Sequence, residues 1–388
     1  MPGSLGKEGK RSSRVRIIAT VIVAVLVLAA VAWLTVQIVN NRSEYTKHST
    51  ISINGNGGFT KANGVVGGSG TVSDPYIIAD WDINASTRIG ISIKDTDTHF
   101  IIRNCYVHDG SASWSGIYLV NCFSGTLENN VCSKNLNGIT LDSSSNNTLV
   151  NNTCSSNSHD GIAIGSSNNE LINNNCSSND YDGIYLVYSS NSTLRNNICR
   201  SDGHAGISLD RSNNNALSNN NCSSNDYDGI YLYSSSNNTL WNNICSSNSH
   251  DGMHLNKSSN NNEISWNLVC SNAGYGMNIS LGDVVLPSGS NNHIWNNIYI
   301  GNNGATDAYN ASHAQARDDG TNNWWNSTDA YGNHGNYWSD WTTPDALSPV
   351  GIVDHPYIIP GSAGAKDYYP LSHNPQKIGI SFIPSCLS

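Results

Sequence analysis

The sequence predicts an all-β protein whose main part is a parallel β-helix of about nine or ten coils, each 22–23 residues long. Three observations lead to this prediction. A Gly-apolar-x-apolar segment recurs every 22 to 26 residues, and cysteine recurs in phase with it. Apolar and polar residues alternate within each segment, which is typical of short strands with one buried face. Clusters of Ser, Asn and Asp between the segments favour turns. The segments begin at Gly90, Gly116, Gly138, Gly161, Gly183, Gly206, Gly229, Gly252 and Gly276, and the cysteines are Cys132, Cys154, Cys176, Cys199, Cys222, Cys245 and Cys270.

The composition of the 388 residues excludes several classes of protein. Charged residues make up 12% of the chain, about half the roughly 25% of an average soluble domain. Abundant Asn, Ser and Gly weaken helix interiors, which argues against a helical bundle. The net charge of −10 argues against nucleic acid as a partner, because phosphate binding needs a basic surface.

The N-terminal region predicts a single membrane anchor. Residues 17–39 form an uncharged run long enough to cross a hydrocarbon core, and they follow a basic tail at 1–16. Positive charge stays on the cytoplasmic side, so the rest of the chain is expected outside the cytoplasm. The alternative is a secreted protein, cleaved near Ala32 after a signal peptide.

We expect a linker and N-terminal cap at 40–88, repeats at 89–303, a C-terminal cap at 304–376 and a tail at 377–388. In stacked coils, equivalent residues lie one above another at roughly 4.8 Å. Buried aliphatic columns are therefore expected, together with a column of asparagines that Asp202 interrupts. The aliphatic columns are Ile162, Ile184, Ile207, Ile230 and Met253; Ile164, Leu186, Leu209, Leu232 and Leu255; and Leu149, Leu171, Leu194, Leu217, Leu240 and Ile264. The asparagines are Asn157, Asn179, Asn225, Asn248 and Asn272.

Several motifs resemble the NosD-like group of β-helix repeat proteins, in particular archaeal surface members. They are the Gly-Ile-Tyr-Leu and Ser-Asn-Asn-Thr-Leu units, the flank Asn56-Gly57-Gly58-Phe59-Thr60, the segment Gly335-Asn336-Tyr337-Trp338-Ser339-Asp340 and the segment Asp367-Tyr368-Tyr369-Pro370-Leu371. The resemblance implies a right-handed, single-stranded parallel β-helix, of a class shared by carbohydrate-binding proteins and sugar hydrolases. It does not identify an activity, because functions differ widely on this scaffold.

Outward positions of one strand column provide the candidate ligand-binding residues Tyr185, Tyr231, Tyr233, His254 and Asp210. Aromatic rings beside carboxylates suit the faces and hydroxyl groups of sugars. The alternative is ordinary packing of tyrosine on a sheet. A second aromatic cluster, with Trp324, Trp325, Trp338 and Trp341, is interpreted as packing within the C-terminal cap.

A column of acids before the repeated glycines contains the weaker catalytic candidates Asp160, Asp182, Asp228 and Asp251. Paired carboxylates about 5 Å apart serve retaining glycosidases. Asp before Gly is also ordinary turn chemistry, and its recurrence on four coils favours that structural role. Beside this column run His159, Tyr181, His204, Tyr227 and His250.

No metal or other cofactor is predicted. The resemblance makes copper a candidate ligand. However, the repeat places one cysteine in each coil, and such a line of free thiols behaves as small apolar residues. The resemblance also raises calcium between the two C-terminal motifs, where residues 344–351 carry too few carboxylates for that ion. Asn146, Asn191 and Asn237 lie in predicted turns and are the candidate glycosylation sites.

These observations favour a membrane-anchored surface protein that binds glycans or other envelope components without catalysis. The first alternative is a polysaccharide hydrolase or lyase. The second, which rests on the resemblance alone, is a factor in copper-protein maturation.

Overall fold

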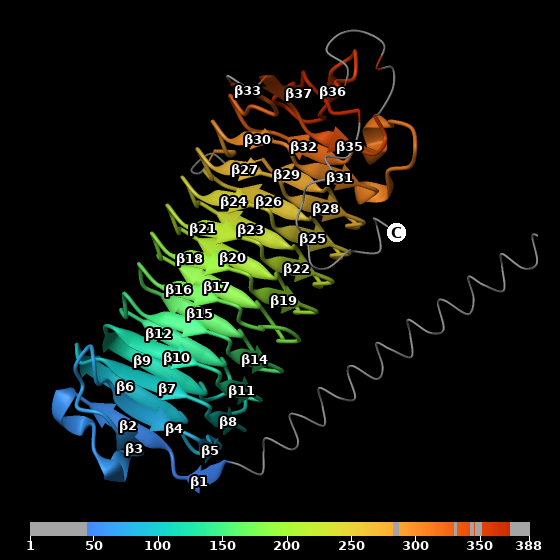
Figure 1. Ribbon diagram of the computed structural model, residues 1–388. Coiled ribbons are helices and arrows are strands. Elements are labelled where there is room, and N and C mark those ends of the chain that lie inside the picture. The colour runs from blue at the N-terminus through green and yellow to red at the C-terminus, as the bar shows by residue number, and fades with distance from the viewer. Residues whose placement is uncertain (1–44, 282–286, 330–331, 342–344, 346–350, 373–388) are drawn as a thin grey trace, which may run out of the picture. The chain divides into compact units, whose positions relative to one another are not determined.

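The computed structural model describes residues 45–281, 287–329, 332–341, 345 and 351–372. It confirms an all-β, right-handed parallel β-helix in which three sheets, parallel except for one antiparallel pair at the N-terminal end, run along one axis (Figure 1). Helical structure within the described residues is limited to four short 3₁₀ turns: η1 (Asn56–Gly58), η2 (Lys61–Asn63), η3 (Asn302–Gly304) and η4 (Ala311–His313).

Most coils contribute one short strand to each of three sheets. Sheet 1 contains β2 (Ile51–Asn54), β6 (Ile91–Thr96), β9 (Ile117–Cys122), β12 (Ile139–Asp142), β15 (Ile162–Gly165), β17 (Ile184–Val187), β20 (Ile207–Asp210), β23 (Ile230–Tyr233), β26 (Met253–Asn256), β29 (Met277–Ile279) and β32 (Ala316–Asp318). Sheet 2 contains β3 (Val65–Gly67), β4 (Tyr76–Ala79), β7 (Phe100–Arg103), β10 (Gly125–Glu128), β13 (Thr148–Val150), β16 (Glu170–Ile172), β18 (Thr193–Arg195), β21 (Ala216–Ser218), β24 (Thr239–Trp241), β27 (Glu263–Ser265) and β30 (His293–Trp295).

Sheet 3 has two runs of strands, which single bridges from Asn175 to Thr153 and to Ile198 connect. The first run contains β1 (Thr46–His48), β5 (Trp81–Asn84), β8 (Tyr106–His108), β11 (Val131–Ser133) and β14 (Thr153–Ser155). The second contains β19 (Ile198–Arg200), β22 (Asn221–Ser223), β25 (Ile244–Ser246), β28 (Leu268–Cys270), β31 (Ile298–Ile300) and β35 (Tyr337–Trp338). Two antiparallel pairs follow near the C-terminus: β33 (Ser327–Asp329) with β34 (Gly332–His334), and β36 (Tyr357–Ile358) with β37 (Lys366–Asp367).

Parallel pairing extends beyond the predicted repeat region at both ends. β2 pairs in register with β6, although it lies in the segment expected to form the N-terminal cap. β32 and β35, expected in the C-terminal cap, continue sheets 1 and 3. The predicted anchor at 17–39, the tail at 1–16 and the tail at 377–388 lie outside the described residues. Within the described residues, no helix is long and apolar enough to span a membrane.

The interior consists of the predicted columns. Ile184 pairs with Ile162 below it and with Ile207 above it, and all three side chains are fully buried. The leucine column of sheet 2 stacks in the same way, as Leu171 on Leu149 and Leu194 on Leu171. Cysteine fills the column of sheet 3 from Cys132 to Cys245, and burial raises the pKa of the Cys199 and Cys245 thiols in it well above the ordinary value. The free, fully buried thiols from Cys132 to Cys245 therefore act as core residues.

Cys270 does not belong to this column, contrary to the sequence prediction. β25 and β28 pair with an offset that places Val269 opposite Cys245 and Cys270 opposite Ser246. Neighbouring residues of a strand point to opposite faces, so Val269 occupies the core position. Cys270 instead packs with Ile244, Leu268 and Ile298 on the other side of sheet 3.

The repeated glycines allow successive coils to approach each other closely. A Cβ atom at Gly161 would lie 2.6 Å from the carbonyl oxygen of Gly183 and 2.8 Å from the Cβ of Cys176. Both distances are too short for real contacts, so a side chain at this position would force the coils apart. Close backbone approach therefore explains the glycine marker.

Buried asparagines join the coils at the corners. At the corner between sheets 2 and 3, each side-chain Nδ2 donates to the Oδ1 of the next coil at 2.9–3.0 Å. This ladder was not foreseen from the sequence. It runs through Asn130, Asn152, Asn174, Asn197, Asn220, Asn243, Asn267, Asn297 and Asn336. The predicted column from Asn157 to Asn272 forms a second ladder of the same kind.

Exposed corner residues account for much of the remaining Asn and Ser. Asn146, Asn191 and Asn237 have φ between 56° and 58°, the left-handed region that Asn tolerates better than most residues. All three are exposed in turns, where the sequence placed them. Their glycosylation stays a prediction.

Stacked aromatic rings close the C-terminal end of the core. Trp338 stacks on Tyr299 at 4.5 Å and on Tyr357 at 4.1 Å between ring centroids, and all three are fully buried. Trp325 is also buried, whereas Trp324 is 60% exposed. Packing in the cap therefore explains Trp325 and Trp338, and Trp324 lies on the surface.

Asp202 occupies an asparagine position in the second ladder. Its Oδ1 accepts hydrogen bonds from the backbone and side chain of Asn179, while its Oδ2 is buried without a partner. Burial raises the pKa of Asp202 to about 9. The acid is therefore neutral at pH 7, since an ionised Oδ2 would be buried without any hydrogen-bond donor.

Asp202→Asn is expected to stabilise the protein increasingly as the pH rises. An acid whose pKa is higher in the folded than in the unfolded state makes the folded protein less stable as the pH rises between these two pKa values. The loss in the free energy of unfolding is up to about 1.4 kcal/mol per pH unit from pH ~4 to ~9. The Asn variant lacks this cost, so its unfolding midpoint should exceed that of the parent at pH 8. The two midpoints should converge near pH 4. Midpoints that differ by the same amount at both pH values would contradict a neutral Asp202.

Candidate functional site

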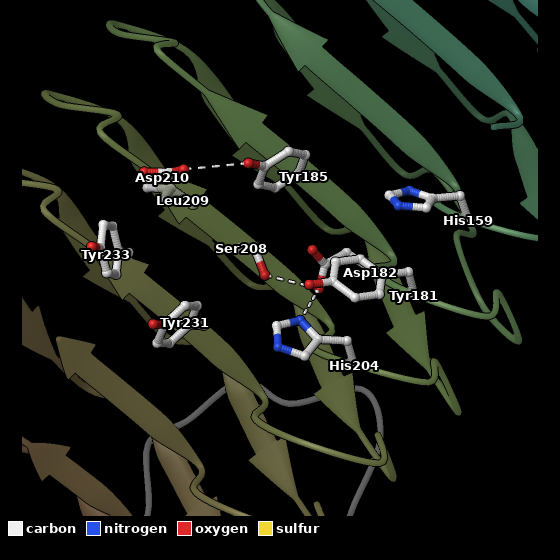
Figure 2. Close-up of a pocket in the computed structure, with 10 residues that line it drawn as sticks. All are labelled: His159, Tyr181, Asp182, Tyr185, His204, Ser208, Leu209, Asp210, Tyr231 and Tyr233. Carbon is white, nitrogen blue, oxygen red and sulfur yellow. Dashed lines mark hydrogen bonds and ion pairs between the residues drawn. The ribbon is translucent and has the colours of Figure 1, made fainter. Parts of the chain in front are cut away.

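A groove lies on the outer face of sheet 1. Its cavity of about 390 Å³ spans strands β17, β20 and β23 (Figure 2). Pairing between these strands places Ser208 between Tyr185 and Tyr231, and Asp210 between Val187 and Tyr233. Small polar residues therefore form the floor, and tyrosines stand on either side of it. The lining consists of His159, Tyr181, Asp182, Tyr185, His204, Ser208, Leu209, Asp210, Tyr231 and Tyr233.

A second depression of about 510 Å³ adjoins the first. Both are lined by His159 and Tyr185, so they are neighbours on the same face. Thr140, Ala163 and Gly165 form its floor between Tyr118 and Tyr185, because small residues leave space between two large rings. The hollowed face therefore extends along sheet 1 from Tyr118 to Tyr231.

An aromatic wall of alternating His and Tyr rings stands on the turns that precede the sheet 1 strands, and its members His159, Tyr181 and His204 line the groove. Their centroids are 4.8, 4.6, 5.1 and 4.4 Å apart along the series His159, Tyr181, His204, Tyr227 and His250. The planes are within 25° of parallel. This rigid aromatic wall is a feature that the repeat pattern alone did not reveal.

Behind this wall lies the column of aspartates. Asp160, Asp182, Asp228 and Asp251 are at most 1% exposed. Each Oδ1 accepts a hydrogen bond from a backbone N–H of the following coil at 2.7–3.1 Å. These carboxylates thus satisfy backbone donors at the turn, which supports the structural interpretation. No catalytic role follows from this arrangement.

Each histidine of the wall is bonded to one of these acids. The hydrogen bond that the His159 ring donates to Asp160 raises the pKa of His159. Burial lowers the pKa of His204, but its 2.8 Å contact with Asp182 outweighs this effect and the net shift is upward. Burial raises the pKa of Asp228, yet hydrogen bonds from His250 and His254 reverse the shift. Contact with these acids therefore favours the charged form of His159, His204 and His250.

Asp182 is the acid of this column that reaches the groove. Its Oδ1 accepts hydrogen bonds from His204, from Ser208 Oγ at 2.9 Å and from the backbone of Ala205 (Figure 2). Its Oδ2 has no partner. A polar ligand in the groove therefore meets a hydrogen-bond network of Asp182, His204 and Ser208.

Four of the five predicted ligand-binding residues line one cavity: Tyr185, Tyr231, Tyr233 and Asp210. The Tyr185 hydroxyl donates to Asp210 Oδ2 at 3.4 Å. Burial raises the pKa of Tyr231 to about 12, so its hydroxyl stays protonated.

Arg211 was missed by the sequence analysis. Its guanidinium carbon lies 5.6 Å from the centre of the Tyr233 ring and its Nη1 lies 3.4 Å from Asp210 Oδ1.

His254 does not line the groove as predicted. It holds the expected outward position of β26, but it is 6% exposed. Its Nδ1 lies 3.1 Å from Asp228 Oδ2 and its Nε2 lies 2.9 Å from Ser280 Oγ. The ring turns toward the acid column because a buried carboxylate is there to bond it, and it is unavailable to a ligand in the groove.

Most of the segment where calcium was weighed, 344–351, lies outside the described residues. Within it, the carboxylate of Asp345 accepts hydrogen bonds from Gly351 N and from Ser372 Oγ.

The pKa of His204 should fall when Asp182 is replaced by Asn. The variant keeps Oδ1 for the Ala205 backbone but removes the negative charge that raises this pKa. Contact with Asp182 contributes stability that is complete below the ordinary histidine pKa of about 6.5 and is lost as the pH rises through the raised value. NMR titration of labelled histidines measures the change, and His250, paired with Asp228, is the internal control. Equal shifts at both histidines would contradict the pairing.

Three comparisons with known proteins bear on this chain. The sequence model of the NosD family, described as periplasmic copper-binding protein, matches residues 35–197 and 166–343. No curated protein matches the chain.

Among solved structures, the A-module of mannuronan C-5 epimerase AlgE6 from Azotobacter vinelandii has a TM-score of 0.51 at 14% identity, covering 73% of this chain and 90% of that one. A double mutant of the periplasmic alginate epimerase AlgG has a TM-score of 0.47 at 18% identity, covering 66% and 67%. Pectate lyase Pel9A has a TM-score of 0.42 at 15% identity, covering 71% and 68%. At these identities, similarity extends to the fold alone.

The family match is the stronger finding, since it agrees with the repeat motifs and with the β-helix of the structure. Its two segments together span residues 35–343, well over half of the sequence, and the chain therefore belongs to the NosD family.

Proposed function

We propose that this protein binds an extended glycan outside the cytoplasm, along the groove of sheet 1. One observation carries the proposal: Tyr185 and Tyr231 flank a floor of Ser208 and Asp210 in a single cavity. Binding pockets typically combine aromatic surface with a few polar groups that fix the ligand's orientation. The family's periplasmic description supports an extracytoplasmic location.

The spacing of the rings suits a repeating polymer. Tyr185 and Tyr231 are two coils apart, which corresponds to roughly 10 Å at the spacing of adjacent strands. A disaccharide unit has about this length. The adjoining depression toward Tyr118 extends the surface by further coils, so several sugar units have room along it.

The charges of the groove favour uncharged sugars. Asp182 and Asp210 both line it, and neighbouring Arg211 is already engaged with Asp210 and the Tyr188 hydroxyl. A polyuronate would bring carboxylates close to these acids, and like charges at short range are unfavourable. We therefore expect neutral polysaccharides to bind more tightly than alginate or pectate.

The copper in the family description has a poor fit to the thiols of this chain. Soft Cu(I) prefers thiolate and thioether ligands. The free cysteines of the described residues are buried in the core, and Met253 and Met277 are buried in the aliphatic columns. Copper-protein maturation through a sulfur site is therefore not part of the proposal. Membrane anchoring through 17–39 is retained on the strength of the sequence alone.

Replacing both Tyr185 and Tyr231 by Ala should weaken binding of a neutral glycan at least tenfold, a loss of about 1.4 kcal/mol or more. Neither side chain supports the interior, so cooperative unfolding should persist. A glycan array identifies the ligand, and calorimetric titration of the full-length protein measures its affinity.

The matched control replaces Trp241 and Tyr368, two exposed aromatic residues that do not line the groove. Equal loss in both double variants, or unchanged affinity in the groove variant, would remove the groove from the binding surface. Release of new reducing ends or unsaturated sugars during the titration would instead identify a hydrolase or lyase.

A further inference from the structure

Four side chains converge beyond the end of the groove, at the turn before β26. They are Asp228, His250, Asp251 and His254, and their nearest ligand atoms lie within 4.8 Å of one another. His250 Nδ1 is 2.7 Å from Asp228 Oδ1 and 3.3 Å from Asp251 Oδ2. His254 Nδ1 is 3.1 Å from Asp228 Oδ2 and 3.8 Å from Asp251 Oδ2. Two imidazole nitrogens therefore face two carboxylates across one small space.

This convergence departs from the repeat. Other coils pair one wall histidine with one acid, as His159 with Asp160 and His204 with Asp182. At the outward strand position they carry Ala163, Tyr185, Ser208 or Tyr231, where the coil of β26 carries His254. Among the described residues, this group alone offers three or more potential His, Cys, Asp or Glu ligands within such a distance.

A buried amide beside the cluster supplies a second observation. Asn278, 9% exposed, donates from Nδ2 to Asp251 Oδ2 at 2.7 Å. Its Oδ1, on the same side-chain carbon, is buried without a partner. A buried carbonyl oxygen without a donor is costly, and a cation within reach would satisfy it.

Bonds outside the cluster orient His254 for metal binding. Ser280 Oγ can accept a proton carried on Nε2, so the ring stays oriented when Nδ1, which donates to Asp228 in the metal-free protein, gives up its proton to a bound metal. A nitrogen lone pair and a carboxylate oxygen then face each other at 3.1 Å, an arrangement that a cation between them stabilises. Hydrogen bonds of this kind fix the ring and tautomer of histidine ligands in metalloproteins.

We propose that Asp228, His250, Asp251 and His254 form a binding site for a divalent cation of the Zn²⁺ type. Two nitrogen and two carboxylate ligands match the four-coordinate sites of zinc. Calcium and magnesium prefer six or more oxygen ligands, and Cu(I) prefers sulfur. His250, whose side chain is 40% exposed, provides access from the surface to the buried acids.

The site connects directly to the aromatic wall and to the groove. The His250 ring stacks on Tyr227 at 4.4 Å, and the His254 ring lies 5.2 Å from that of Tyr231. A bound cation would fix both imidazoles and so hold this end of the wall in place. The site does not depend on glycan binding, because its ligands are separate from the residues that line the groove.

Calorimetric titration of the tag-free, full-length protein with Zn²⁺, after dialysis against a chelator, tests the proposal. We expect one equivalent to bind and the thermal midpoint to rise, because a ligand specific to the folded state stabilises it. Both His250→Gln and His254→Gln should weaken binding at least tenfold. His159→Gln, a wall histidine with a single acid partner, is the matched control and should bind as the parent does.

Co²⁺ provides an optical readout that is independent of any activity. Intense visible bands of a four-coordinate complex should appear in the parent and weaken in His250→Gln, a half-exposed position where the fold tolerates substitution. Failure of Zn²⁺ to bind would overturn the proposal. So would equal binding by His250→Gln, or equal affinity for Ca²⁺ and Zn²⁺. Binding of Zn²⁺ that both cluster variants lose and His159→Gln keeps would establish the site.

Discussion

The hydrogen bond between identical side-chain amides of successive coils is the interaction on which this structure depends. Each coil stacks on the next at the spacing of adjacent strands, so every buried position must be compatible with a copy of itself. An aliphatic side chain meets this condition in the sheets. At the corners a polar group must both donate and accept, and an amide does so, as between Asn174 and Asn197. The high asparagine content of the chain is therefore a consequence of the stacked coils. The low fraction of charged residues follows as well, because like charges stacked on one another repel.

Outward-facing positions of the strands need not be compatible with a copy of themselves, so functional side chains can differ from coil to coil there. Core positions of sheet 1 repeat Ile and Leu with little change, whereas their outward neighbours vary from Ala163 to Tyr185 and Ser208. Large rings beside small residues hollow the surface without disturbing the interior. The His–Tyr wall is an intermediate case, because its rings stack like core residues but stand at the surface. Chemical variety in sheet 1 is thus found at its outward positions.

Buried acids mark the places where the repeat carries charge. Asp202 in the amide ladder is neutral at pH 7, because burial raises its pKa to about 9. Asp228 and Asp251 are kept near two imidazoles instead. Ala205, at the same turn position, shows that the coil closes without an acid there. The aspartates at this turn are therefore more than a folding requirement, and their pairing with histidine is the chemically distinctive feature of this β-helix.

The sequence by itself determined the period, the fold, the buried columns and the placement of Tyr185 and Tyr231 on either side of Ser208, because strand alternation and stacking fix these once the repeat is known. The tertiary structure determined the positions of Cys270 and His254, which the spacing of the repeats does not predict. Cys270 left its column because β25 and β28 pair with an offset of 24 residues, while the cysteines are 25 apart, and a slip of one residue reverses the face of a strand. His254 turned away from the groove because a buried Asp228 lies beside it, a contact between residues 26 positions apart. Pairing between coils sets such neighbours, and only the folded chain brings them together.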